Sequence, residues 1–425
     1  MTRKVAALAW CRAVQTIFVL LLGLMLPNMP AASREVATNA RQILVMLRIP
    51  PDHHRPSASY GGDYADAFTI AAQRRRAEDI AHRYGLAFVG NGWQMPLLGV
   101  DCYVMQVGPG DTVETAIKRI SDDSNVLWSQ AMHLYRAEAS PSPIVNDPLA
   151  DLQPVTTAWN LTALHRVATG RGVVVAVVDS RVQLDHPDLA GQFVSSENFV
   201  DTDNGPAETH GTGVAGVIAA KAGNAIGIAG VAPRAKLMAL RACWQTDATK
   251  QTAPTVCDSL SLAKALQYAI EHSADVINLS LSGPPDRLLA NLIDIAAHRG
   301  IVIVAAYDPT LPQGGFPASA PDVIPVDIDS ASTAPSGVYL APGEDVPTTQ
   351  PGGQWALAHG SSYAAAHVSG LVALLREDRK NAPVALLATP RLTGGVIDAC
   401  ATLLHAGKPC DCDCPIHAHA IMAGR

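Results

Sequence analysis

The segment Gly360-Ser361-Ser362-Tyr363-Ala364-Ala365-Ala366-His367-Val368-Ser369-Gly370 decides how the rest of the chain is interpreted. Its glycine and two serines predict a sharp turn, and the small and apolar residues that follow predict a buried helix. A serine at a helix N-terminus can act as a nucleophile, because the unpaired N–H groups and the helix dipole there can stabilise an oxyanion. The same pattern also suits a serine that only caps a buried helix. Segments further upstream decide between the two.

The composition of the chain favours a large α/β core. Hydrophobic residues make up 48% of the 425 residues and aromatic residues only 5%, so the core is built from Ala, Val, Ile and Leu. Such a core suits a parallel sheet covered by helices. The formal net charge of −7, without a long basic run, argues against nucleic acid as a partner.

Residues 1–33 have the features of a secretory signal peptide. Positive residues Arg3 and Lys4 precede an apolar run from Thr16 to Leu26, and small residues around Ala31 suit cleavage. The apolar run is too short to span a bilayer. We therefore expect an exported protein, periplasmic or secreted, without a stable membrane span.

Residues 41–137 carry the pattern of a small α+β domain. Strands are expected at residues 42–49, 86–89, 100–107 and 126–134, and helices at 67–84 and 111–120. Their order, βαββαβ, is that of a split βαβ unit. Residues 138–146 are rich in Pro and Ser, which indicates an exposed linker that a protease can cut.

From residue 147 to residue 407 the pattern changes to alternating strands and helices. Apolar strands are expected at residues 172–179, 236–241, 275–280, 301–306, 323–328 and 338–341, and a helix at 260–272. These runs predict an α/β fold with a doubly wound, mostly parallel sheet. Catalytic groups on such sheets gather at the carboxyl ends of the strands, where Asp179 and Ser280 stand.

The three residue types that serine catalysis needs occur in separate segments. Asp179 ends a buried strand, His210 begins a run of small residues, and Ser362 begins the helix described above. A nucleophilic serine needs a base that takes its proton and an acid that orients the base. Each residue alone also suits a structural role, as a strand-end acid or a helix cap.

The flanks of these residues resemble the subtilisin-like serine peptidases (subtilases) from residue 147 to about residue 406. Five motifs agree in order: VAVVDSRVQLDHPDL, THGTGVAGVIAA, NAIGIAGVAPRAKLMALRA, ADVINLSLSGP and GSSYAAAHVSGLVALL. The order Asp, His, Ser is that of the family's triad. The resemblance implies that Ser362 attacks the scissile carbonyl, that His210 is general base and then acid, and that Asp179 orients His210. It also implies that residues 41–137 are an inhibitory propeptide, which is cut off in or near the linker.

Several residues depart from the family pattern without removing a reacting group. Arg181 stands where the family has glycine, Gly213 where it has histidine, and Tyr363 where it has methionine. The family's oxyanion-binding asparagine is replaced by Asp308, or by Pro309 if the alignment shifts by one residue.

The resemblance also assigns the substrate cleft. The segment Ser280-Leu281-Ser282-Gly283 matches the strand beside the S1 subsite, and Tyr307 falls near it. Because Tyr307 and Ser282 replace family glycines, we expect a preference for small P1 residues.

Asp308 separates the hypotheses on function. An ionised aspartate cannot donate a hydrogen bond to the oxyanion, whereas a protonated one can. The first hypothesis is an exported serine endopeptidase that cleaves proteins or peptides, with activity biased towards acidic pH. The alternative is a catalytically impaired relative that binds peptides in the same cleft. An esterase or amidase is a third hypothesis, although a propeptide and an edge-strand cleft suit extended peptides better.

Cysteine usage fits an oxidising compartment. Loss of the signal peptide with Cys11 and of the propeptide with Cys102 would leave six cysteines, an even number. A bridge between Cys243 and Cys257 would close a loop and stabilise the chain by roughly 3 kcal/mol.

The expected partners are protein or peptide substrates and the chain's own propeptide, and we expect a monomer that requires no cofactor. The tail, residues 408–425, carries Cys410, Cys412 and Cys414 in a spacing that fits no standard zinc site. Disulfides with Cys400, or a loose tail, are the alternatives to a metal cluster. A structural calcium ion would use Asp188 and the loop from Asn224 to Ile228, which match the family's calcium site in part.

Overall fold

The computed structural model describes residues 41–49, 62–90, 92–137, 140–144, 148–200, 205–247, 250, 253–330, 335–378, 383–391 and 394–408. The expected signal peptide and residues 409–425 of the expected tail lie outside these ranges. In the part of the chain that is described, no helix combines the length and the apolar character needed to cross a bilayer.

The N-terminal domain, residues 41–137, is built on an antiparallel sheet. Its elements are β1 (Gln42–Arg48), α3 (Gly62–Arg83), β2 (Leu86–Phe88), β3 (Trp93–Met95), the short 3₁₀ helix η1 (Pro96–Leu98), β4 (Val100–Val107), α4 (Val113–Ile120) and β5 (Val126–Ala131). The strand order is β2-β4-β1-β5, with β3 paired to β4. The expected strands and helices are present here within a few residues. β3 was not expected, because three residues are too few to form a pattern.

The C-terminal domain, from residue 147 to residue 407, contains a nine-stranded sheet of order β20-β21-β17-β16-β15-β13-β8-β10-β9. The strands are β8 (Val174–Asp179), β9 (Phe193–Asn198), β10 (Lys236–Arg241), β13 (Val276–Leu279), β15 (Val302–Ala306), β16 (Val323–Ile328), β17 (Tyr339–Ala341), β20 (Ala388–Arg391) and β21 (Gly394–Ile397). Only β20 and β21 pair antiparallel; the other pairs are parallel. The prediction of a doubly wound, mostly parallel sheet is therefore confirmed.

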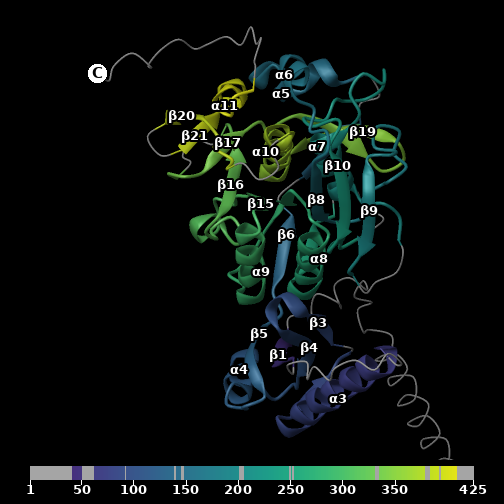
Figure 1. Cartoon of the computed structure of the whole chain (residues 1–425), viewed down its shortest axis with the longest axis vertical. Coiled ribbons are helices and arrows are strands. Elements are labelled where there is room, and N and C mark those ends of the chain that lie inside the picture. Colours follow the sequence, from purple (N-terminus) through teal and green to yellow (C-terminus); the bar gives the residue numbers. More distant parts are fainter. Residues whose placement is uncertain are drawn as a thin grey trace, which may run out of the picture. The chain divides into compact units, whose positions relative to one another are not determined.

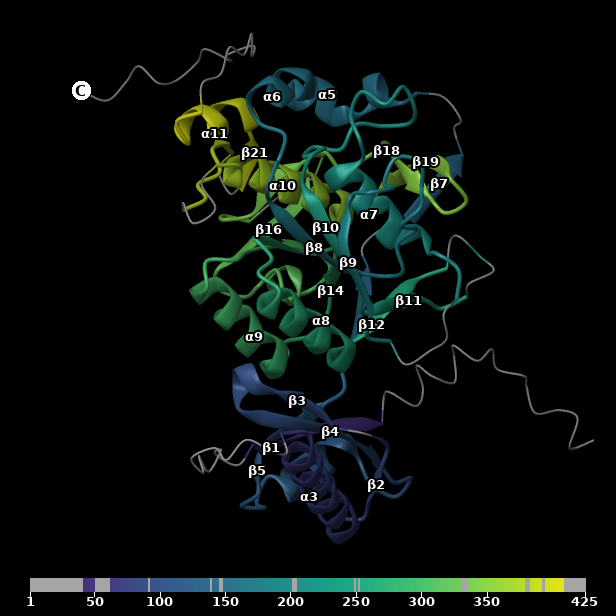
Figure 2. The same ribbon diagram turned by 45° about the vertical axis from the view of Figure 1, so that its right-hand side comes forward.

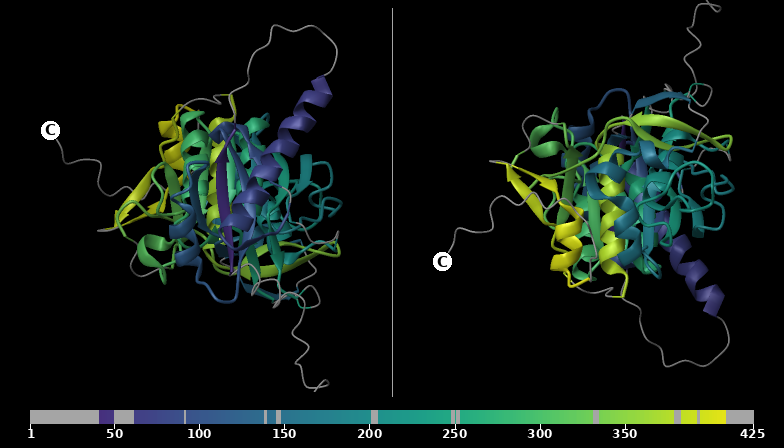
Figure 3. Two further views of the ribbon diagram at one scale, coloured as in Figure 1. Left: turned by 90° about the horizontal axis from the view of Figure 1, so that it is seen from below. Right: turned by 90° about the horizontal axis from the view of Figure 1, so that it is seen from above.

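Helices cover both faces of this sheet (Figures 1 and 3). One face carries α5 (Pro154–Trp159), α6 (Leu161–Val167), α7 (Thr209–Ala219), α10 (Ser361–Arg376) and α11 (Ala399–His405), and the other carries α8 (Ser259–Glu271) and α9 (Arg287–His298). Strand β8 shows why two layers form. Val175 and Val177 pack in the cluster of α7 and α10, whereas Ala176 and Val178 pack in the cluster of α8 and α9.

Two smaller antiparallel sheets flank the main sheet. The first has the order β11 (Cys243–Gln245), β12 (Thr255–Asp258), β6 (Leu134–Ala137) and β14 (Leu281–Ser282). The second has the order β18 (Val346–Gln350), β19 (Gln354–His359) and β7 (Ser140–Ile144). Strand β7 thus lies within the segment that was expected to be an exposed linker. Local composition could not predict it, because its hydrogen-bond partners come from β19, more than two hundred residues later.

Helix α10 contains a histidine that burial keeps neutral. His367 is fully buried, its Nδ1 lies 2.8 Å from the Pro342 oxygen, and its ring packs edge-on against Trp159. Burial lowers the pKa of His367 from 6.5 to about 4, against the opposing effect of the Pro342 hydrogen bond.

We expect this histidine to destabilise the fold at acidic pH. The unfolded chain takes up the proton near pH 6.5 and the folded chain only near pH 4, so stability falls as pH falls through this window. The difference corresponds to roughly 3 kcal/mol at the acidic end. His367→Asn keeps an N–H donor for Pro342 but cannot titrate, so its free energy of unfolding should depend less steeply on pH.

The measurement is urea unfolding between pH 4 and pH 7 of Ser362→Ala protein, with the exposed His405→Asn as the matched control. Burial also lowers the pKa of His165 and of His186, so the slope should shrink without vanishing. Equal slopes for the His367 and His405 variants would contradict the assignment.

Candidate active site

Asp179 and His210 meet at the carboxyl end of the central strand β8. Both side chains are buried, and His210 Nδ1 lies 2.7 Å from Asp179 Oδ1. A carboxylate only accepts hydrogen bonds, so Nδ1 carries the proton and Nε2 is left as the basic nitrogen. Nε2 is buried and has no hydrogen-bond partner among the described residues. It is therefore available to take a proton from a hydroxyl group.

Side chains fasten the loop after β8 to the first turn of α7. Gly211 N donates to Ser180 Oγ (3.0 Å), Arg181 N to Glu208 Oε2 (2.7 Å), and Gln183 N to Thr212 Oγ1 (3.0 Å). These bonds fix the distance between Asp179 and His210. Sequence reasoning missed Glu208, which precedes the histidine motif by one residue and is buried.

Ser362 is fully buried near the start of α10 and is tied to the end of β13. Its Oγ donates to the Ser280 oxygen at 3.1 Å, and Ser280 Oγ donates to the Ser362 oxygen at 2.9 Å. The next residue, Tyr363, lies with its ring centre 6.0 Å from that of His210, which places the start of α10 beside the histidine. In this structure the Ser362 hydroxyl is thus bonded to the Ser280 oxygen.

Gly213 and Tyr363 both depart from the family pattern, and the small residue makes room for the large one. A Cβ atom on Gly213 would lie 3.1 Å from Tyr363 Cε1 and 3.0 Å from Thr348 Cγ2. Tyr363 therefore occupies the space that the family's histidine at position 213 would need. Burial and the charge of Asp179 raise the pKa of Tyr363, so its ring stays neutral beside the catalytic pair.

Ser282, Gly283 and Asp308 line one cavity of about 580 Å³. Tyr307, which was expected to line the substrate pocket, is not among the lining residues. Its ring instead packs against Gly314, where a Cβ atom would overlap it. Of the two side chains that were expected to narrow the substrate pocket, Ser282 lines this cavity. Its Oγ donates to the Gly314 oxygen at 3.3 Å.

Asp308 lies at the same sheet edge as Ser282. Asp308 N and Ser282 Oγ both donate to the Gly314 oxygen, at 3.0 Å and 3.3 Å, which places the two residues beside each other. Asp308 is 8% exposed, and its Oδ1 accepts hydrogen bonds from Thr310 N (2.8 Å) and Thr310 Oγ1 (2.7 Å).

The residues of the expected calcium site bind one another through N–H donors. Asp188 is fully buried and accepts hydrogen bonds from Asn224 Nδ2 (2.7 Å), Ile228 N (3.0 Å) and Trp355 Nε1 (2.7 Å). The Asn224 side-chain oxygen accepts from Ile226 N at 3.0 Å. Calcium takes six to eight oxygen ligands, so this arrangement of the described residues does not fit the ion. No catalytic step below uses a metal.

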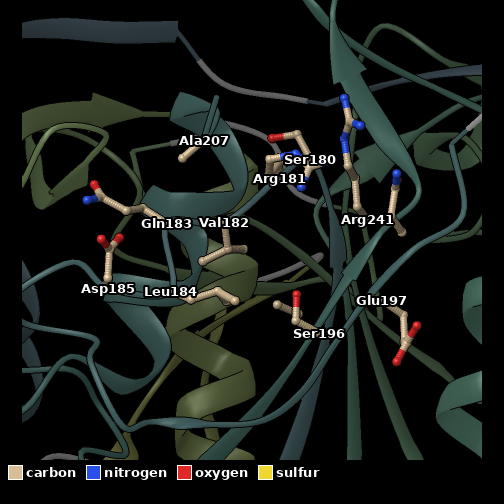
Figure 4. Close-up of a pocket in the computed structure, with 12 residues that line it drawn as sticks. Ser180, Arg181, Val182, Gln183, Leu184, Asp185, Ser196, Glu197, Ala207 and Arg241 are labelled. Carbon is tan, nitrogen blue, oxygen red and sulfur yellow. The ribbon is translucent and has the colours of Figure 1, made fainter. Parts of the chain in front are cut away.

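A second cavity, of about 430 Å³, lies at the loop that follows β8 (Figure 4). Ser180 and Arg181 come from the loop after β8, and Arg241 comes from β10. Burial and the nearby Arg241 lower the pKa of Arg181, while Glu208 opposes the shift. Arg241 Nη2 lies 3.5 Å from Glu208 Oε1. The negative charge of Glu208 thus partly balances the positive charges of Arg181 and Arg241 at this cavity. No motif in the sequence predicted the cavity.

Comparison with known proteins agrees with this geometry. The sequence model described as "Peptidase_S8: Subtilase family" matches residues 170–391. The chain belongs to the subtilase family. It is thus a subtilisin-like serine peptidase, as the motifs predicted.

Three relatives illustrate the extent of the similarity. The thermophilic serine proteinase of Bacillus sp. (strain AK1) is 34% identical over 294 residues, which are 65% of this chain and 69% of the relative. Subtilisin E of Bacillus subtilis (strain 168) is 32% identical over 280 residues, or 62% of this chain and 68% of subtilisin E. Thermitase of Thermoactinomyces vulgaris is 36% identical over 230 residues, or 51% of this chain and 79% of thermitase.

The fold resembles that of fervidolysin from Fervidobacterium pennivorans, described as a keratinolytic enzyme related to subtilisin. The TM-score is 0.62 at 22% sequence identity, and the match covers 85% of this chain and 60% of fervidolysin. At this identity the likeness concerns the fold alone.

We expect Gly211→Ala to disable catalysis by separating Asp179 from His210. An added Cβ atom would overlap the backbone oxygen of Ser180 and lie 3.2 Å from Asp179 Oδ1. A displacement of about 1 Å in such a site costs about 100-fold in rate, so kcat should fall at least that far.

The matched control is Gly213→Ala, whose closest neighbours are the side chains of Thr348 and Tyr363, which can move. Its kcat on a peptide substrate should change much less. Similar losses in the two variants would show that the close approach at Gly211 has no special role.

Proposed function

We propose that this chain is the precursor of an exported serine endopeptidase whose triad is Asp179, His210 and Ser362. The observation that carries the proposal is the 2.7 Å contact between His210 Nδ1 and Asp179 Oδ1, next to the helix that begins at Ser361. Subtilase membership and the names of the relatives support the reaction type. The pattern of residues 1–33 supports export.

The chemistry follows from these groups. His210 Nε2 takes the Ser362 proton while Ser362 Oγ attacks the scissile carbonyl carbon, and Asp179 stabilises the imidazolium that forms. His210 then gives the proton to the leaving amine, which leaves an acyl-enzyme. A water molecule, deprotonated by His210, attacks the ester in the same way and releases the acid. N–H groups at the start of α10 can stabilise the oxyanion in both steps.

The position of β6 supports an extended peptide as substrate. β6 pairs antiparallel with β12 on one side and with β14 on the other. Ala137 pairs with Leu281, the neighbour of Ser280, whose oxygen accepts the Ser362 hydroxyl. A peptide that inserts between two edge strands gains main-chain hydrogen bonds along both of its edges.

Buried polar contacts between the N-terminal domain and helices α8 and α9 support the proposal that this domain is an inhibitory propeptide. Asp286, at the start of α9, accepts hydrogen bonds from Gln130 Nε2 (2.7 Å), Ser259 Oγ (2.6 Å) and His133 Nδ1 (3.2 Å). Although burial opposes it, these bonds lower the pKa of Asp286. Tyr135 is fully buried, and its ring lies against Gly283. A domain held in this way blocks the cleft that it occupies.

We expect the precursor to cut itself within residues 135–151, the window that the linker composition indicates. Ala137, at the end of β6, pairs with Leu281, the neighbour of Ser280, whose oxygen accepts the Ser362 hydroxyl, so the end of β6 lies close to the proposed nucleophile.

N-terminal sequencing of purified protein tests the position, and Ser362→Ala should accumulate as the longer form. Processing of Ser362→Ala at the wild-type rate would exclude self-cleavage. A fluorophosphonate probe that fails to label Ser362 in mature protein would favour the alternative, a catalytically impaired peptide-binding relative.

We expect Asp308→Asn to raise activity at neutral and alkaline pH. A carboxylate at this position only accepts hydrogen bonds and repels the oxyanion, whereas an amide can donate to it. Loss of one such donor costs roughly 10²–10³ in kcat in a relative, so the gain can be of that size.

The matched control is Asp308→Ala, which removes the charge without supplying a donor. Its kcat between pH 5 and pH 9 should stay well below that of Asp308→Asn. Identical pH profiles for wild type and Asp308→Asn would place Asp308 outside the oxyanion site.

A further inference from the structure

The disulfide between Cys243 and Cys257 joins the two strands at one side of the substrate cleft. The two residues face each other across β11 and β12, with their Cα atoms 4.1 Å apart. Both are buried, at 1% and 0% exposure. Figure 2 shows β11 and β12 side by side.

Strand β12 has two neighbours, and one of them is the segment that substrate would replace. On one side Cys257 pairs with Tyr135 and Val256 pairs with Arg136, both of β6. On the other side β12 pairs only with the three residues of β11. When β6 leaves after processing, β11 is the sole remaining sheet partner of β12 among the described residues.

The other attachments of these strands lie at their ends. Gln245 N donates to Glu208 Oε1 at 3.0 Å, which holds β11 to the start of α7. The carboxyl end of β12 is fixed by α8, where Ser261 N donates to Asp258 Oδ1 at 2.8 Å. Residues 255–257 themselves are held by the pairing with β11, by the disulfide, and by the packing of Val256 with Val200 and Trp244 and of Cys257 in the large cluster that includes α8.

We infer that this disulfide preorganises the edge to which the substrate backbone adds, and that its loss weakens peptide binding without disabling the triad. The inference rests on the proposed function, in which substrates take the place of β6. A strand that is already ordered spares the substrate the entropy cost of ordering it on binding. Asp179, His210 and Ser362 lie on β8, α7 and α10, and the disulfide belongs to none of these elements.

The test compares a long and a minimal substrate in Cys243→Ala/Cys257→Ala enzyme. The long substrate is a quenched peptide with the sequence of residues 133–142, which spans the register of β6. The minimal substrate is the p-nitrophenyl ester of acetyl-alanine, which does not reach β12. For the peptide, KM should rise about tenfold with kcat nearly unchanged. For the ester, kcat/KM should stay within about twofold, which also shows that the variant is folded.

Treatment with a reducing agent tests the same inference without a mutation. Wild-type enzyme in dithiothreitol should show the same rise in KM, and the double variant should show no further change. The latter result excludes an effect through Cys400, which is also disulfide-bonded. Cys102→Ala, at a free buried cysteine of the N-terminal domain, is the matched control and should leave mature KM unchanged.

Hydrogen exchange gives a readout that needs no activity. The amides of residues 255–257 should exchange faster in the double variant than in wild type, while those of β8 should not change. An unchanged peptide KM, unchanged exchange of residues 255–257, or equal losses on peptide and ester would each overturn the inference. If wild type cleaves neither substrate, the proposed function fails, and the exchange rates still decide whether the disulfide orders this edge.

Discussion

The rest of the structure depends on the complete burial of helix α10. All residues from Ser361 to Arg376 are buried. This close packing requires small side chains, as at Gly370, where a Cβ atom would lie 2.5 Å from Val231. Ser369 Oγ also donates to Asn278 Oδ1 at 2.8 Å, which holds the helix to β13. Because the helix cannot shift, its N-terminus has one position relative to the sheet edge.

The helices near the cleft differ in the residues that stand at their N-termini. Asp258 and Asp286 cap α8 and α9 and accept N–H groups of their first turns, and Glu208 precedes α7. Helix α10 instead begins after Gly360, with no acidic residue in its first turn and no side chain as a cap. Tyr363 N and Ala364 N donate to the Gly360 oxygen. The N–H groups that can meet a developing negative charge are therefore those of Ser361 and Ser362, and a carboxylate cap would exclude such a charge.

The sequence predicted the parts of the fold that have strong local patterns. The strands at residues 236–241 and 323–328 appear with the expected bounds, and the Asp179–His210 contact follows from motifs with specific flanks. Short strands such as β12 and β14 were not foreseen, because two to four residues carry no periodicity and β6, a partner of both, is distant in sequence.

The structural roles of individual polar residues could not be predicted from the sequence either. Asp286 and Glu208 look like ordinary surface acids in the sequence, yet both are buried and bonded to several donors. The direction of the Tyr307 ring was not predictable either, because the ring packs against Gly314, where no side chain competes for the space.

The N-terminal domain shares a hydrophobic cluster with the catalytic helices, and this has a consequence for when activity begins. Leu44, Met46 and Val104 pack in the same buried cluster as Leu266 of α8 and Leu292 of α9. Cutting one peptide bond leaves this apolar contact intact, so the two pieces must still separate against the hydrophobic effect. On the proposed processing, dissociation of the N-terminal domain is therefore a separate step between cleavage and access of other proteins to the cleft, and the buried apolar contact sets its free-energy cost.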